Sequence, residues 1–125
     1  MLADKGLVSA LEAQARKASL PVAVEAAGVG RYSQDVEAAV YFCALEALQN
    51  VAKYAGATKA DVRLAATNGS LTFEVVDDGR WFDAATAKRG AGLTNMGDRL
   101  SALGGTLDLV SEPGRGTTIR GRIPV

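Results

Sequence analysis

Two short segments carry polar side chains whose types and spacing could do chemistry. The first contains Glu46, Asn50 and Lys53. An amide oxygen such as that of Asn50 is a hard ligand that suits Mg²⁺, which takes few protein ligands and keeps waters and phosphate oxygens. Glu46, one helical turn earlier, could orient or deprotonate a nucleophile. Lys53 could contact phosphate oxygens as a point charge.

The second segment ends in an acidic turn. Asp77 closes a strand that contains residues 72–76, where a carboxylate is out of place unless it is paired. Such a carboxylate can accept a hydrogen bond from an exocyclic amine such as that of adenine. Gly79 has no side chain, so a flat base could approach its backbone closely. An ordinary Asp-Asp-Gly turn explains the same residues equally well.

Two further features follow along the chain. Gly90 and Gly92 precede a helical pattern that begins at Leu93, and free N–H groups at a helix start favour anions. Thr117 follows Gly116 at the start of a strand, where its hydroxyl could lie near Asp77. Helix-capping glycines and ordinary strand packing are the plainer explanations. The order of all these features together predicts a nucleotide site.

A long helix over residues 34–54 must position the first segment, with Ser33 as its N-cap and Gly56 as its stop. At about 100° per residue, Glu46, Asn50 and Lys53 fall on one narrow stripe. The opposite stripe is apolar and is expected to pack on a sheet; it contains Tyr41, Ala44, Leu45, Leu48, Val51 and Ala52. A helix that simply faces solvent on its polar side has the same pattern.

The remaining elements are read from periodicity and turn residues. Asn68-Gly69 between two apolar runs predicts a β-hairpin. The expected elements are a helix over 4–19, a strand over 21–25, strands over 61–67 and 71–76, a loop over 80–91, a helix over 93–103 stopped by Gly104-Gly105, and strands over 106–110 and 117–125 around a turn at 112–116. This order predicts an α+β fold: a two-layer sandwich with helices on one face of a mixed sheet, formed by residues 1–125 as one domain.

Composition excludes several classes of function. Acidic and basic residues balance at 14 each, so no strong field favours nucleic acid or a membrane surface. Cys43 is the only cysteine and is expected to be a small buried filler, whereas Asp98 and Arg99 are expected to be surface charges. No apolar run approaches the ~20 residues that span a bilayer, so a cytoplasmic location is expected. The absence of histidine argues against a triad hydrolase.

At this point the motifs resemble those of the GHKL ATPases. The matching positions are Glu46, Asn50 and Lys53 for the N box, residues 77–79 for the G1 box, residues 90–93 for the G2 box, and Gly116-Thr117 for the closing strand. A finer resemblance, carried by residues 41–50, 92–100 and 111–117, is to the catalytic, ATP-binding domain of sensor histidine kinases of the NarL/LiaS-like group. The opening residues 6–11 are also similar to the start of this domain.

The resemblance implies a Bergerat fold, with ATP and Mg²⁺ as cofactors, and a role for each motif residue. Asn50 would coordinate Mg²⁺, Glu46 would assist transfer and Lys53 would contact phosphate. Asp77 would bind the adenine amino group, directly and through water shared with Thr117, and Gly79 would make room for the ring. Gly90, Gly92 and Leu93 would belong to the ATP lid.

The implied partners are a phosphoacceptor His on a separate dimerisation domain and the Asp of a response regulator. Because the chain has no histidine, it cannot be its own acceptor, and the isolated domain is not expected to autophosphorylate. The isolated domain is also expected to be a monomer. The dimerisation and sensor domains would lie elsewhere, and the full-length kinase would be either membrane-anchored or soluble.

Two departures from the family pattern keep other functions in view. Trp81 replaces the second glycine that usually follows the G1 box, and Tyr54 stands where a histidine is common. One alternative is a degenerate docking module that no longer binds nucleotide. The other is a serine kinase of the anti-sigma-factor type, from the same superfamily.

Overall fold

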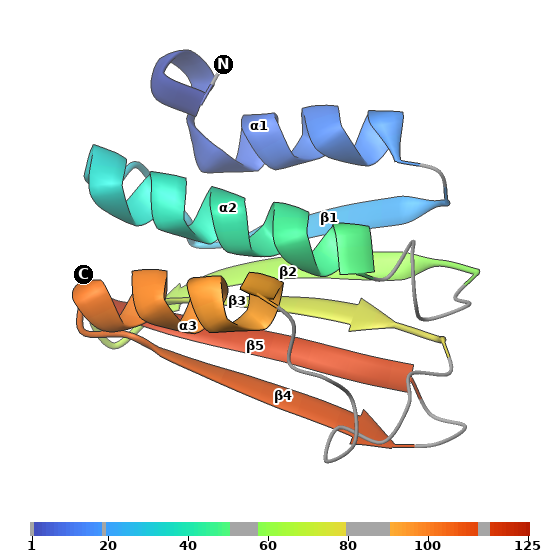
Figure 1. The fold of residues 1–125 in the computed structure, drawn as a ribbon. Coiled ribbons are helices and arrows are strands. Elements are labelled where there is room, and N and C mark those ends of the chain that lie inside the picture. Colours follow the sequence, from blue (N-terminus) through green and yellow to red (C-terminus); the bar gives the residue numbers. More distant parts are fainter. Residues whose placement is uncertain (1, 19, 51–57, 80–90, 113–115) are drawn as a thin grey trace.

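The structure, a computed structural model, describes residues 2–18, 20–50, 58–79, 91–112 and 116–125. Its elements in chain order are α1 (Leu2–Lys17), β1 (Val22–Ala27), α2 (Gln34–Asn50), β2 (Ala60–Thr67), β3 (Ser70–Asp77), α3 (Ala91–Ala102), β4 (Thr106–Glu112) and β5 (Gly116–Pro124) (Figure 1). The predicted elements are confirmed, with ends that differ by a few residues. The predicted end of the second helix, most of the loop over 80–91 and the middle of the turn over 112–116 lie outside the described residues.

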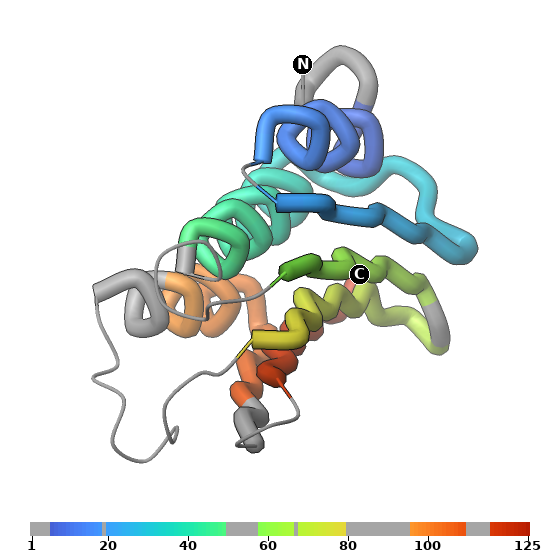
Figure 2. The backbone as a smooth tube through the Cα atoms, turned by 90° about the vertical axis from the view of Figure 1, so that its right-hand side faces the viewer, coloured from blue at the N-terminus to red at the C-terminus, as the bar shows by residue number. Residues whose placement is uncertain are grey.

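The five strands form one mixed sheet in the order β1-β2-β3-β5-β4. β1 runs parallel to β2, and the other three neighbouring pairs are antiparallel. The three helices lie on one side of this sheet, as the end-on view of Figure 2 shows. The predicted two-layer α+β sandwich is therefore confirmed.

The hairpin between β2 and β3 forms where Asn68-Gly69 predicts it. Both residues have positive φ, 51° for Asn68 and 75° for Gly69, the conformation that a two-residue hairpin turn of type I′ requires. The turn sets the register so that Ala60, the first residue of β2, pairs with Asp77, the last residue of β3. A local turn signal thus determines which residues lie beside Asp77.

The core lies between the sheet and α2, but α2 buries more of its surface than one stripe. Ala44 and Leu48 are buried as predicted, whereas Tyr41 and Leu45 are only half-buried. Tyr41 instead lies toward α1, where its hydroxyl accepts a hydrogen bond of 3.0 Å from Nε2 of Gln14. The buried apolar residues that the predicted stripe omits are Val36, Ala39, Val40, Cys43 and Ala47. Because α2 contacts α1, α3 and the sheet, a single apolar face was the wrong expectation.

The start of α2 is fixed by capping groups. Ser33 Oγ accepts a hydrogen bond of 3.3 Å from the Val36 amide, which confirms the predicted N-cap. Glu37 is only 2% exposed, and its carboxylate accepts hydrogen bonds from Arg31 Nε and the Tyr32 amide, both at 3.2 Å. Glu37 is thus a buried carboxylate that is paired, and an unpaired charge at this position would be costly.

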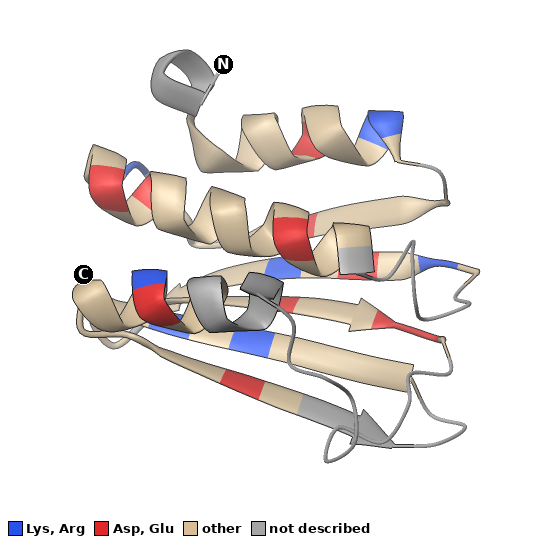
Figure 3. Cartoon of the chain, in the orientation of Figure 1, with Lys and Arg blue, Asp and Glu red and all other residues tan. Residues whose placement is uncertain are grey.

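The face of the sheet away from the helices carries a row of alternating charges. The register aligns one charged residue on each strand: Glu25, Arg63, Glu74, Arg120 and Asp108. Figure 3 shows the alternation of red and blue across the strands. Arg120 Nη2 lies 3.2 Å from Glu74 Oε2, and Arg63 Nε lies 3.8 Å from Glu25 Oε2. Exposed pairs of this kind add little stability, but they keep this face polar, so the core lies on the helix side alone.

Candidate functional site

The elements that carry the predicted site residues converge at one end of the molecule. The end of α2, the end of β3 and the beginnings of α3 and β5 all point to this end (Figures 1 and 2). Sheet register joins two of them directly, because Asp77 on β3 pairs with Thr117 on β5. Residues that are far apart in the sequence are thus brought to the same end of the sandwich.

Asp77 and Thr117 form the buried polar centre of this end. Their side chains are 4% and 2% exposed, and they share the helix-facing side of the sheet with the buried Ala60. The amide of Gly79 donates a hydrogen bond of 2.8 Å to Asp77 Oδ1. The Asp77 carboxylate is therefore held by the turn that follows it. It lies beside the Thr117 hydroxyl on the neighbouring strand.

Gly116 lets β5 approach Asp77 at close range. A Cβ on Gly116 would overlap the carbonyl oxygen of Asp77 and lie 3.0 Å from its carbonyl carbon. The φ of Gly116 is 86°, a conformation that favours glycine. The Gly116-Thr117 pair thus needs its glycine to place the threonine opposite Asp77.

The residues predicted on the second helix are placed less completely. Glu46 is half-buried on α2, and Asn50 is the last residue of that helix, one turn further on. The side chain of Asn50 and the whole of Lys53 lie outside the described part of the chain. The roles assigned to these three residues stay predictions.

The residues predicted for the lid are placed by backbone alone, or not at all. Gly92 and Leu93 lie in the first turn of α3, which begins at Ala91, and their side chains are not among those described. Gly90 and Trp81 lie outside the described residues. The first turn of a helix presents unpaired N–H groups, which favour anions.

The structure adds an aromatic contact that the sequence did not indicate. The guanidinium carbon of Arg99 on α3 lies 3.9 Å from the ring centroid of Phe42 on α2. Arg99 and Asp98 are exposed, as expected for surface charges. No sequence pattern pairs two residues on separate helices, so only the fold could reveal this cation–π contact.

Cys43 is completely buried between α2 and α3, which confirms its prediction as a filler. Its thiol lies 3.8 Å from the carbonyl oxygen of Met96 and donates to it. Burial raises the pKa of the Cys43 thiol to about 12, while Arg99 lowers it and Glu46 raises it by smaller amounts. The thiol is thus protonated at neutral pH.

We expect Cys43 to resist alkylation in the folded protein. At pH 8, reaction with iodoacetamide should be slower than in the urea-unfolded chain by on the order of a thousandfold, because the thiolate is the reactive form. Mass spectrometry of native and unfolded samples measures both rates. Rapid labelling of the native chain would contradict the buried position.

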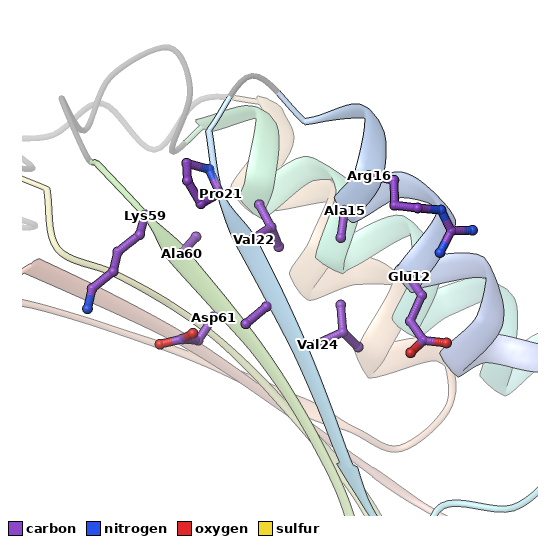
Figure 4. Close-up of a pocket in the computed structure, with 10 residues that line it drawn as sticks. Glu12, Ala15, Arg16, Pro21, Val22, Val24, Lys59, Ala60 and Asp61 are labelled. Atoms are coloured by element: carbon purple, nitrogen blue, oxygen red, sulfur yellow. The ribbon is translucent and has the colours of Figure 1, made fainter.

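A groove lies between α1, the edge strand β1 and the start of β2, on the other side of Ala60 from its sheet partner Asp77 (Figure 4). Its volume is about 540 Å³, and it is lined by Glu12, Ala15, Arg16, Pro21, Val22, Ala23, Val24, Lys59, Ala60 and Asp61. None of the predicted site residues lines it. Its charged residues are of both signs, so the groove shows no preference for an anionic ligand. The candidate nucleotide site is therefore placed at Asp77.

The described residues contain no group of three or more His, Cys, Asp or Glu side chains that could hold a metal ion. None of the helices in the described ranges is long and apolar enough to cross a membrane.

Comparison with known proteins identifies the family to which this fold belongs. Residues 35–125 match the family described as histidine kinase-, DNA gyrase B-, and HSP90-like ATPase. The chain belongs to this family, and the matched range includes α2, β3, α3 and β5, the elements that converge near Asp77.

Two relatives and one solved structure show which members of this family the chain is similar to. The chain is 33% identical to the sensor histidine kinase MctS of Rhizobium johnstonii, over 99% of this chain and 29% of that protein. It is 34% identical to the sensor histidine kinase LiaS of Bacillus subtilis, over 74% of this chain and 26% of that protein. The ATP binding domain of PrrB from Mycobacterium tuberculosis has a similar fold, with a TM-score of 0.73 and 22% identity over 94% of this chain and 90% of that one.

The chain spans less than a third of the length of these two curated relatives. It corresponds to the ATP-binding catalytic domain of a sensor histidine kinase. The predicted family resemblance is confirmed.

Proposed function

We propose that this domain binds ATP with its adenine at Asp77. A buried carboxylate at the end of a strand can accept a hydrogen bond from the exocyclic amine of the base. Thr117 lies opposite on β5, and Gly79 has no side chain to block a flat ring. The single observation that carries this proposal is the buried Asp77–Thr117 pair, held by the Gly79 amide.

The triphosphate would extend from Asp77 toward the first turn of α3. Free N–H groups there, at Gly92 and Leu93, favour phosphate oxygens. Gly90 and Lys53 would add backbone and side-chain donors. Asn50 would supply an amide oxygen to Mg²⁺, and the ion would neutralise the charge that develops on the phosphates.

Bound in this way, ATP would donate its γ-phosphoryl group to a histidine on a separate dimerisation domain. The bond from the γ-phosphorus to the β,γ-bridging oxygen breaks, a phosphorus–nitrogen bond to the imidazole forms, and ADP leaves. Glu46, half-buried one turn before Asn50, would orient the imidazole or take its proton. The phosphoryl group would then pass to an aspartate of a response regulator.

Histidine is the favoured acceptor because both curated relatives are named sensor histidine kinases. The chain itself has no histidine, so the acceptor must be supplied by another domain. We propose that residues 1–125 act as one catalytic unit in this division of labour.

A transfer assay tests the proposal. The chain, radiolabelled ATP and Mg²⁺ are mixed with the phosphoacceptor domain of the MctS relative. We expect acid-labile, base-stable label on the acceptor, none when its histidine is replaced by glutamine, and at least a tenfold loss with Asn50→Ala. Label on this chain alone, or an acid-stable phosphoserine on the acceptor, would contradict the proposal.

A further inference from the structure

Asp78 makes a cluster of hydrogen bonds that the proposed function leaves unexplained. Its Oδ1 accepts hydrogen bonds from the amides of Thr58 at 2.8 Å and Lys59 at 3.1 Å. Its Oδ2 accepts a third from the hydroxyl of Thr58. One exposed carboxylate thus holds two consecutive residues that lie about 20 positions away in the sequence.

These contacts join two points that flank the candidate site. Thr58 and Lys59 directly precede β2, whose first residue, Ala60, pairs with Asp77. On the other side, the Gly79 amide bonds to the Asp77 carboxylate at 2.8 Å. The turn of residues 77–79 is therefore held by one hydrogen bond inside it, from Gly79 to Asp77, and by the hydrogen bonds that Asp78 accepts from Thr58 and Lys59.

The same hydrogen bonds keep the Asp78 carboxylate ionised. The Thr58 hydroxyl, followed by the Lys59 and Thr58 amides, lowers the pKa of Asp78 from 3.8 to about 2. A depressed pKa adds stability that is present above the ordinary value and is lost as the pH falls through about 2. Across the neutral range these contacts are therefore intact.

We propose that Asp78 is a positioning residue of the nucleotide site. Through Thr58 and Lys59 it fixes the turn that presents Asp77 and Gly79 to the base, without contacting the nucleotide itself. This inference rests on the proposed function, and it gives two adjacent aspartates different roles. Asp77 binds the base, and Asp78 positions the turn that carries Asp77.

The hydrogen-bond geometry makes a specific prediction about replacements. In Asp78→Ala all three acceptor contacts are lost, and affinity for a non-hydrolysable ATP analogue should fall on the order of tenfold, the equivalent of one or two net hydrogen bonds. Asp78→Asn should bind within about twofold of the original chain, because an amide oxygen still accepts from both backbone amides. Thr58→Val removes only the hydroxyl contact and should cost about threefold.

Calorimetry of the 125-residue chain with the analogue and Mg²⁺ measures these affinities, with urea unfolding run on every variant. Glu74→Ala is the matched control, because it removes another carboxylate, on the preceding strand β3, that pairs with Arg120 on the sheet face away from the helices. It should leave affinity unchanged. Amide hydrogen exchange should become faster at Thr58 and Lys59 in Asp78→Ala and not in Glu74→Ala.

The outcomes separate this inference from the function on which it rests. If the folded original chain binds no nucleotide, both fail. If it binds and Asp78→Ala binds equally well, only the positioning role is overturned. If Asp78→Asn is as weak as Asp78→Ala, the negative charge matters rather than the hydrogen bonds, which also overturns it. Should Asp78→Ala not fold, Thr58→Val decides, since unchanged affinity there contradicts the role.

Discussion

Replacing Asp77 by asparagine is expected to weaken nucleotide binding by on the order of a hundredfold while leaving the fold intact. The asparagine oxygen can still accept the Gly79 amide, now 2.8 Å from Asp77 Oδ1, so the turn should persist. The charge is lost, and an NH₂ group that cannot accept a hydrogen bond replaces one carboxylate oxygen. A charge-assisted hydrogen bond to the base is lost and polar groups are left unpaired in a buried site.

Calorimetry with a non-hydrolysable ATP analogue checks this expectation. Asp108→Asn is the control, because it makes the same chemical change on an exposed strand position of β4. Its affinity should equal that of the original chain. If Asp77→Asn bound the analogue as tightly as the original chain, the buried carboxylate would not be the group that binds the base.

The second large effect is expected at Gly116. Alanine there would place a methyl group on the carbonyl of Asp77 and force a non-glycine residue to a φ of 86°. Overpacking and left-handed backbone together should lower the free energy of unfolding by about 2 to 4 kcal/mol. β5 would have to move away from β3, so the Asp77–Thr117 pair and nucleotide binding should be lost as well.

Urea unfolding measures the Gly116→Ala effect, and Gly97→Ala provides a control of opposite sign. Gly97 lies within α3 with nothing within 4 Å of an added Cβ. Alanine there should stabilise the fold by up to about 1 kcal/mol through helix propensity. A Gly116→Ala chain as stable as the original would contradict the close approach of β5.

Local signals predicted much of the fold correctly. Asn68-Gly69 specifies its turn through backbone conformations that few other residues adopt, and Ser33 caps α2 through a hydrogen bond within one turn. Both depend only on neighbours in the sequence. Together with periodicity, these local signals predict where the strands and helices begin and end. The order of those elements in turn predicts the two layers.

Contacts between distant segments could not be predicted in the same way. Tyr41 was placed on the stripe that packs on the sheet, yet it hydrogen-bonds to Gln14 of α1, because α2 is surrounded by three neighbours. The hydrogen bonds that Asp78 accepts from Thr58 join two loops that only the assembled sheet brings together. Neither follows from a pattern along the chain.

The candidate site was predicted in part. Motif order and the family resemblance predicted Asp77 and Thr117 as site residues, and the sheet register places them side by side. The supporting role of Asp78 was missed, because an Asp-Asp-Gly turn does not show which aspartate faces inward. The roles of all the predicted site residues, those of Asp77, Gly79 and Thr117 included, stay predictions.

The most direct test of this account maps where nucleotide binds. Amide chemical shifts of the ¹⁵N-labelled chain are recorded during titration with a non-hydrolysable ATP analogue and Mg²⁺. We expect saturable changes that are largest at Asp77, Gly79 and Thr117. Changes confined to Ala15, Arg16 and β1, which line the groove beside α1, would contradict the account, as would no change in a folded sample.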